Sequence, residues 1–177
     1  MQLSTFWRHT ALLCCLMTFT GSIAMSAQGN MNNRKLEKSL RRMADRVDGH
    51  AGSWQLYYKN RILLVLTDDV NNRMRIFTPI IDAMDLDPDE MHKMLEANFH
   101  SALDAKYCLS NGFVVAVFNH PLRQLRRVQL FDALDQVATL AENFGTTYSS
   151  TDLIFGEESV DPPKVNQSPT GRKDKGK

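Results

Sequence analysis

The sequence predicts an α+β fold, an antiparallel sheet of about five strands with helices in the order α-β-β-β-α-β-β-α. Apolar residues recur at helical spacing in some segments and at strand spacing in others. Every link between consecutive strands is short, which suits antiparallel hairpins and leaves no room for a parallel crossover. The chain has 177 residues, 43% hydrophobic and 23% charged, so it can form one ordinary hydrophobic core.

The first half of the predicted domain holds one helix and three strands. Asn32 and Asn33 precede apolar residues at three- and four-residue spacings, and Asp48-Gly49 is expected to end this helix. Turns are predicted around 59–60 and 68–72, between three strands that end at Pro79. The apolar residues that define these elements are Leu36, Leu40, Met43 and Val47, then Trp54, Leu56, Tyr58, the run 62–66, Met74 and Ile76.

The second half begins with a clear helix start. Asp87 is the expected N-cap, Pro88 occupies the first helical position, and Glu90 completes a capping box. A hairpin is predicted around Asn111-Gly112, since a type I′ turn needs positive φ at both central residues. A long helix of about 122–143 follows and ends before Gly145. The buried face of the earlier helix is predicted to be Met91, Met94, Leu95, Phe99 and Ala102.

Both ends of the chain are expected to lie outside the domain, which spans 32–155. Residues 1–27 are typical of a secretory signal peptide, with an apolar run over 10–20 followed by small residues, so we expect a periplasmic or secreted protein. Residues 156–177 are poor in large apolar side chains and are predicted to be disordered. Removal of the signal peptide leaves Cys108 as the single cysteine, which cannot form an internal disulfide. It is either a buried apolar residue or an intermolecular link, and its place in a predicted strand favours burial.

Charge and motifs exclude several function classes. The formal net charge is +1, which argues against a nucleic-acid binder, and no stable membrane span is expected after processing. No GxSxG motif and no glycine-rich phosphate loop occurs, so we expect no enzymatic activity and no cofactor.

Three polar groups could hold a ligand, and each has a simpler explanation. His92, Glu96 and His100 lie four residues apart and could hold zinc, although solvated side chains on a polar helix face are the favoured explanation. An acidic cluster spaced like a calcium loop lacks the glycine such a loop needs and suits a helix start. A basic cluster could bind an anion or face solvent. The acidic cluster is Asp85, Asp87, Asp89 and Glu96, and the basic cluster is Arg123, Arg126 and Arg127.

The strands are apolar at both parities. Leu63, Val65 and Phe77 alternate with other apolar residues, whereas a half-exposed sheet should have one polar face. Either the helices cover all of this surface, or a subunit or another polypeptide completes its burial. We take Leu63, Val65 and Phe77 as the candidate partner-binding residues.

The chain resembles the YbjN family in its element order and in two segments, Ala97-Asn98-Phe99-His100 and 107–115. That family is similar in fold to the class I type III secretion chaperones. The resemblance covers about 34–147. It implies a twisted antiparallel sheet, a homodimer, and protein binding instead of catalysis. Those chaperones are cytoplasmic, whereas this chain carries a predicted signal peptide.

The leading hypothesis is an exported, chaperone-like protein that buries apolar segments of a polypeptide partner. The alternative is an envelope module that binds a small ligand or a metal through the histidine or the arginine cluster.

Overall fold

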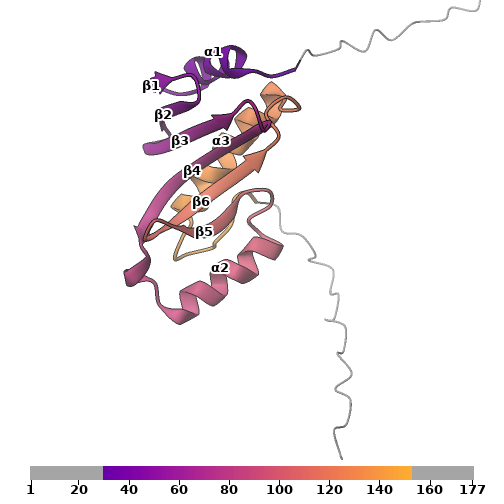
Figure 1. The fold of residues 1–177 in the computed structure, drawn as a ribbon. Coiled ribbons are helices and arrows are strands. Elements are labelled where there is room, and N and C mark those ends of the chain that lie inside the picture. Colours follow the sequence, from indigo (N-terminus) through magenta and orange to yellow (C-terminus); the bar gives the residue numbers. More distant parts are fainter. Residues whose placement is uncertain (1–29, 153–177) are drawn as a thin grey trace, which may run out of the picture.

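The computed structural model describes residues 30–152, which form an α+β fold with a six-stranded antiparallel sheet in the order β1-β2-β3-β4-β6-β5 (Figure 1). The predicted signal peptide and the predicted tail lie outside the described residues. The fold class is therefore confirmed. The elements are α1 (Asn33–Met43), β1 (Arg46–His50), β2 (Ser53–Tyr58), β3 (Arg61–Asp68), β4 (Arg73–Asp82), a short 3-10 turn (Ala83–Asp85), α2 (Pro88–His100), β5 (Lys106–Ser110), β6 (Phe113–His120) and α3 (Arg127–Glu142).

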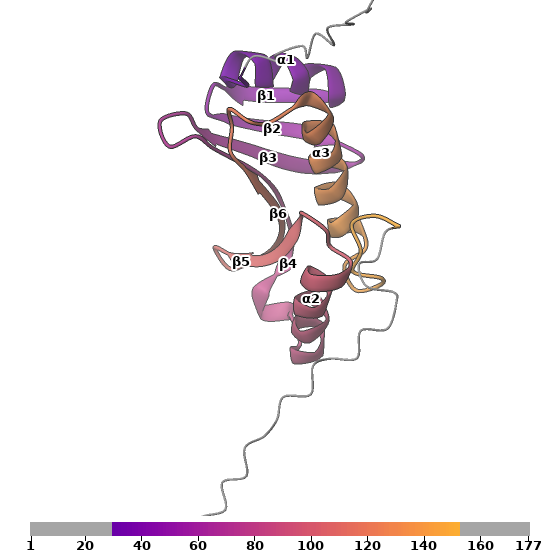
Figure 2. The ribbon, with the colours of Figure 1, turned by 90° about the vertical axis from the view of Figure 1, so that its right-hand side faces the viewer.

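The three helices pack against one face of the sheet. The helix α3 contacts β3, β4 and β6, while α1 lies beside β1 and α2 lies beside β5 at the opposite end of the sheet (Figures 1 and 2). Side chains from all three helices join the same hydrophobic core as alternate strand residues. Fully buried members of this core include Leu36, Leu40, Trp54, Leu56, Leu63, Val65, Ile76, Leu130 and Leu134.

The local signals for the second helix and for the hairpin are confirmed. The backbone N–H of Glu90 donates to the Asp87 carboxylate at 2.8 Å, and the Glu90 side chain accepts from the Asp87 N–H at 3.3 Å. This reciprocal pairing satisfies backbone N–H groups at the helix start that have no carbonyl acceptor within the helix. Asn111 and Gly112 have φ values of 51° and 83°, as a type I′ turn requires.

The element order contains one strand that the sequence analysis did not predict. The helix α1 ends at Met43, and Val47 belongs to β1, where it pairs with Leu56 in the sheet. Gly49 has φ 114°, and a Cβ there would lie 2.4 Å from the carbonyl oxygen of Ser53. Glycine at this position thus permits a tight β1–β2 hairpin, and Asp48-Gly49 belongs to a strand instead of ending a helix.

Two predictions about the other helices are wrong in part. The last helix begins at Arg127, although Leu122 and Leu125 are buried in the loop before it. The periodic apolar pattern therefore extends beyond the helix.

Within α2 only Met94 and Ala97 are buried, because a helix beside an edge strand contacts the sheet along a narrow stripe. The predicted core residues Met91, Leu95 and Phe99 are exposed.

Candidate binding surface

The register between β3 and β4 decides which apolar residues share a face. Val65 pairs with Ile76, and Leu64 pairs with Phe77. Leu63 and Val65 have 0% exposure and lie in the core under the helices, whereas Phe77 is half-buried on the opposite face. The prediction that Leu63, Val65 and Phe77 lie on one face is therefore wrong, since a shift of one residue in register exchanges the two faces of a strand.

We call the sheet face opposite the three helices the open face. Figure 2 shows the sheet strongly curved, with α3 on one side of it. Ile62 is 51% exposed and Leu66 is 39% exposed on this face. Val115 and Val117 are buried there by their neighbours on the same face, outside the main core. The apolar side chains of the open face are Tyr57, Ile62, Leu64, Leu66, Phe77, Phe113, Val115 and Val117.

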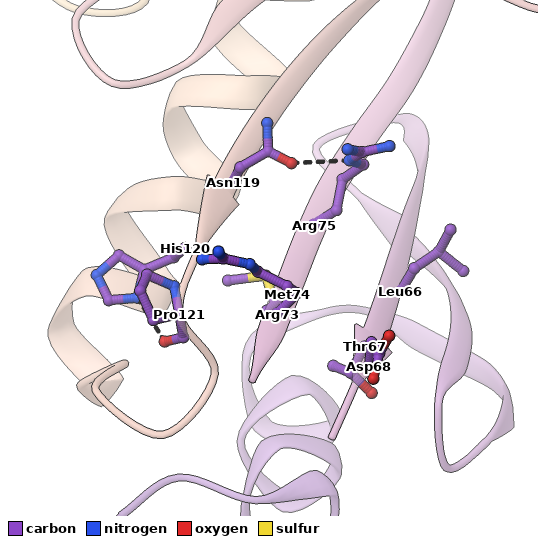
Figure 3. A pocket seen from close by; sticks show the side chains of 9 residues that line it. All are labelled: Leu66, Thr67, Asp68, Arg73, Met74, Arg75, Asn119, His120 and Pro121. Carbon is purple, nitrogen blue, oxygen red and sulfur yellow. Dashed lines mark hydrogen bonds between the residues drawn. The ribbon is translucent and has the colours of Figure 1, made fainter. Parts of the chain in front are cut away.

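One hollow lies on the open face between β3 and β5, and a second lies beside it at the end of β3, the start of β4 and the end of β6. A cavity of about 360 Å³ has apolar walls that include Leu66, Phe77 and Val117. A second cavity of about 500 Å³ continues past it (Figure 3). The Arg75 Nε donates to the Asn119 Oδ1 at 2.7 Å, and this pair lines both cavities. The open face thus combines apolar depressions with one oriented guanidinium group.

The larger cavity has a polar rim. Arg73 and Arg75 project from β4, and His120 projects from β6 beside them (Figure 3). Asp68 also lines this cavity, but its carboxylate accepts the side-chain amide and the backbone N–H of Asn71, which lower the pKa of Asp68. The rim therefore carries charged side chains of both signs.

Cys108 is exposed, which corrects the prediction that it is buried. It lies on the edge strand β5, opposite Val115 in the register, so no strand covers its outer side. Partial desolvation raises the pKa of the Cys108 thiol, although the positive charge of Arg75 opposes this shift. A thiol with a raised pKa is a poor nucleophile at neutral pH.

Side chains block part of both edges of the sheet. The Asn98 side-chain amide accepts the Tyr107 N–H at 2.7 Å and donates to the Tyr107 carbonyl at 3.0 Å. On the other edge, the Arg41 guanidinium donates to the Val47 carbonyl at 3.2 Å. These bonds occupy backbone groups that an added strand would need. Asn98 belongs to one of the segments that resemble the YbjN family, but its contact with Tyr107 depends on the folded structure.

The structure does not assemble the candidate metal ligands. His92, Glu96 and His100 are all exposed on α2. Within 30–152, no group of three or more His, Cys, Asp or Glu side chains is placed to hold a metal ion. The acidic cluster instead supplies helix-start contacts through Asp87. In the basic cluster, the Arg123 guanidinium donates to the Asp69 carbonyl at 2.8 Å.

No family model matches the chain, and no curated protein matches it. The YbjN resemblance therefore stays a prediction. One similar solved structure is the HopA1–SchA chaperone–effector complex, with 13% identity and a TM-score of 0.49, covering 62% of this chain and 88% of that chain. Another is the ExsC–ExsE complex, with 14% identity and a TM-score of 0.48, covering 63% of this chain and 92% of that chain. Both likenesses are distant.

None of the helices in the described part is long and apolar enough to cross a membrane.

Proposed function

We propose that this chain is a non-enzymatic, chaperone-like protein whose open face binds an apolar segment of another polypeptide. The observation that carries this proposal is the asymmetry of the sheet, because all three helices pack on one face while the other face keeps apolar side chains exposed. Exposed apolar surface of this kind typically marks an interaction site. The apolar run over 10–20 supports a role outside the cytoplasm.

The contacts favour burial of side chains on the open face over addition of a strand at an edge. Asn98 and Arg41 already occupy backbone groups on the two edge strands. The open face offers apolar positions on neighbouring strands, including Ile62, Leu66 and Phe77. Each apolar side chain that a partner buried fully would contribute about 1.5–3 kcal/mol before the cost of ordering that partner.

The test measures binding of the purified full chain to an array of extended, apolar, uncharged peptides. Leu66→Asp and Phe77→Asp should each reduce peptide binding at least tenfold, because a carboxylate would then face the bound apolar side chains. Val128→Asp, on an exposed position of α3, is the matched control and should bind as the original chain does. Circular dichroism establishes that each variant is folded. Unchanged binding by folded Leu66→Asp and Phe77→Asp would contradict the proposal.

Cys108 supplies an independent readout of the same surface. Its thiol lines the smaller cavity with Phe77 and Val117. A peptide bound there should slow alkylation of Cys108 by a maleimide. Alkylation that proceeds at the same rate with saturating peptide would place the peptide elsewhere on the chain.

We propose further that the chain forms a homodimer through the exposed side of α2. Met91, Leu95 and Phe99 follow one another at four-residue spacing and are 42%, 62% and 80% exposed. Side chains at this spacing form one stripe on a helix, which a second copy could cover. Light scattering should show a dimer that Leu95→Asp converts to a folded monomer, whereas Val128→Asp should remain dimeric. A monomeric original chain would contradict this proposal.

A further inference from the structure

The surface where α1 meets the start of α3 is strongly basic although the whole chain is nearly neutral. The helix α1 has 11 residues, of which five are Lys or Arg and one, Glu37, is acidic. Glu37 is engaged by Arg41 at 2.7 Å, on the same helix. The helix α1 holds no second acidic residue. Its other basic residues are Arg34, Lys35, Lys38 and Arg42. Of these, the Lys35 Nζ donates to the Asn30 carbonyl at 2.8 Å.

Three of these side chains share one cavity with a basic residue of α3. The cavity has a volume of about 260 Å³ and is lined by Lys35, Lys38, Arg42 and Arg127, with Met31 and Leu125 among its apolar walls. No acidic residue lines it. The Asn30 carbonyl engages Lys35, and three further cationic side chains, Lys38, Arg42 and Arg127, line the same hollow. Like charges around one small hollow repel one another, and a bound anion would relieve that repulsion.

The start of α3 adds to the positive potential. Arg127 is the first residue of α3, and the first turn of α3 contains no acidic residue. The N-terminal end of a helix carries a partial positive charge, and an arginine there opposes the usual preference for acids. The cavity therefore receives a favourable field for an anion from the Arg127 side chain and from the start of α3.

We propose that this cavity is a binding site for a phosphoryl group, either on a soluble phosphorylated molecule or on a phospholipid headgroup. Arginine binds phosphate oxygens through two parallel N–H donors, and lysine adds a compact positive charge. The cavity suits one phosphoryl-bearing group because four cationic side chains line one small volume. This site does not depend on the open face, since it lies between α1 and α3 on the helical side of the sheet.

The experiment uses the full chain and two probes. Calorimetry with inorganic phosphate, at constant ionic strength, tests a soluble source. Co-sedimentation with phosphatidylcholine vesicles, with and without phosphatidylglycerol, tests a headgroup source. The variants are Lys38→Gln/Arg42→Gln and Arg127→Gln, and the matched control is Lys93→Gln/Arg61→Gln, which removes two cations outside this cavity.

Each cation removed from the cavity should weaken binding about five-fold, whereas the control should leave it unchanged. Binding to phosphate, or to phosphatidylglycerol vesicles alone, supports the site and identifies its source. Three results would overturn it: no binding to either probe, equal weakening in the control, or full binding by folded Arg127→Gln. Circular dichroism of each variant distinguishes loss of the site from loss of the fold.

Discussion

The two faces of the sheet are built from the same strands but have different surroundings. On β3, Leu63 is fully buried under the helices, while its neighbour Ile62 is 51% exposed on the open face. Both are large aliphatic residues, so composition does not distinguish them. The difference teaches that apolar content in a strand stabilises the fold only where another layer covers it, and leaves exposed apolar surface where none does.

The largest expected effect comes from a charge placed on the covered face, which is the face of the sheet that the three helices pack against. Val65→Asp should abolish folding, because a carboxylate buried without a partner costs about 4 kcal/mol or more. Far-UV circular dichroism measures the result. Ile62→Asp, on the open face of the same strand, should remain folded. A folded Val65→Asp protein would mean that the covered face is not the core.

Truncation of side chains should show the same asymmetry at a smaller scale. Leu63→Ala should lower the free energy of unfolding by about 2–5 kcal/mol, because it leaves a cavity in the packed core. Leu66→Ala, on the open face, should change it by about 1 kcal/mol or less. Urea titration of both variants gives the comparison. Equal losses would show that something covers the open face as completely as the helices cover the other.

The edge contact of Asn98 should have a moderate effect. Asn98→Ala leaves the buried Tyr107 with an unpaired N–H and carbonyl, which should cost about 1–3 kcal/mol. The exposed edge should also promote association between chains, which light scattering detects. Asn98→Asp keeps an acceptor for the Tyr107 N–H, so its free energy of unfolding should lie between those of the original chain and Asn98→Ala. If Asn98→Ala neither destabilises nor associates, the edge is protected by another contact.

The smallest effect near neutral pH concerns two tyrosines on the covered face. Burial raises the pKa of Tyr58, with a further contribution from its hydrogen bond to Asp135, and burial raises the pKa of Tyr107. Below pH 10 both hydroxyls are protonated whether the chain is folded or unfolded. The two raised pKa values then make their full contribution to the free energy of unfolding. Above pH 10 the unfolded chain ionises first, and the free energy of unfolding should fall.

A series of urea titrations from pH 8 to higher values measures this slope. Tyr107→Phe should reduce the slope, because the variant has one fewer group that ionises only after unfolding. Tyr57→Phe, which removes a hydroxyl from the exposed face of β2, is the control. An identical slope in Tyr107→Phe would show that this tyrosine does not contribute to the pH dependence.

Local signals in the sequence predicted local structure well. The capping box of Asp87 and the turn at Asn111-Gly112 depend on neighbouring residues, and both are confirmed. The strand β1 was missed because its five residues include one buried apolar residue, Val47, which also fits the helical spacing of α1. The start of α3 was misplaced because Leu122 and Leu125 are buried without being helical.

The candidate site was harder to predict because it depends on contacts between distant segments. The alternation of apolar residues predicted that both faces of the strands are apolar. It could not predict that Phe77 pairs with Leu64, since the turn between β3 and β4 sets that register. The basic cavity could not be predicted either, because the nearly neutral net charge of the chain gives no sign that Lys38 and Arg127 line the same cavity.

The sequence by itself determined the α+β class, the antiparallel hairpins and the excess of apolar strand residues, because propensity, turn chemistry and periodicity act over a few neighbouring residues. Only the tertiary structure decided which face the helices cover and where basic side chains gather. Those outcomes follow from strand register and helix packing, which join residues far apart in the chain. The same packing that buries Leu63 leaves Ile62 and Leu66 exposed on the other face of the sheet.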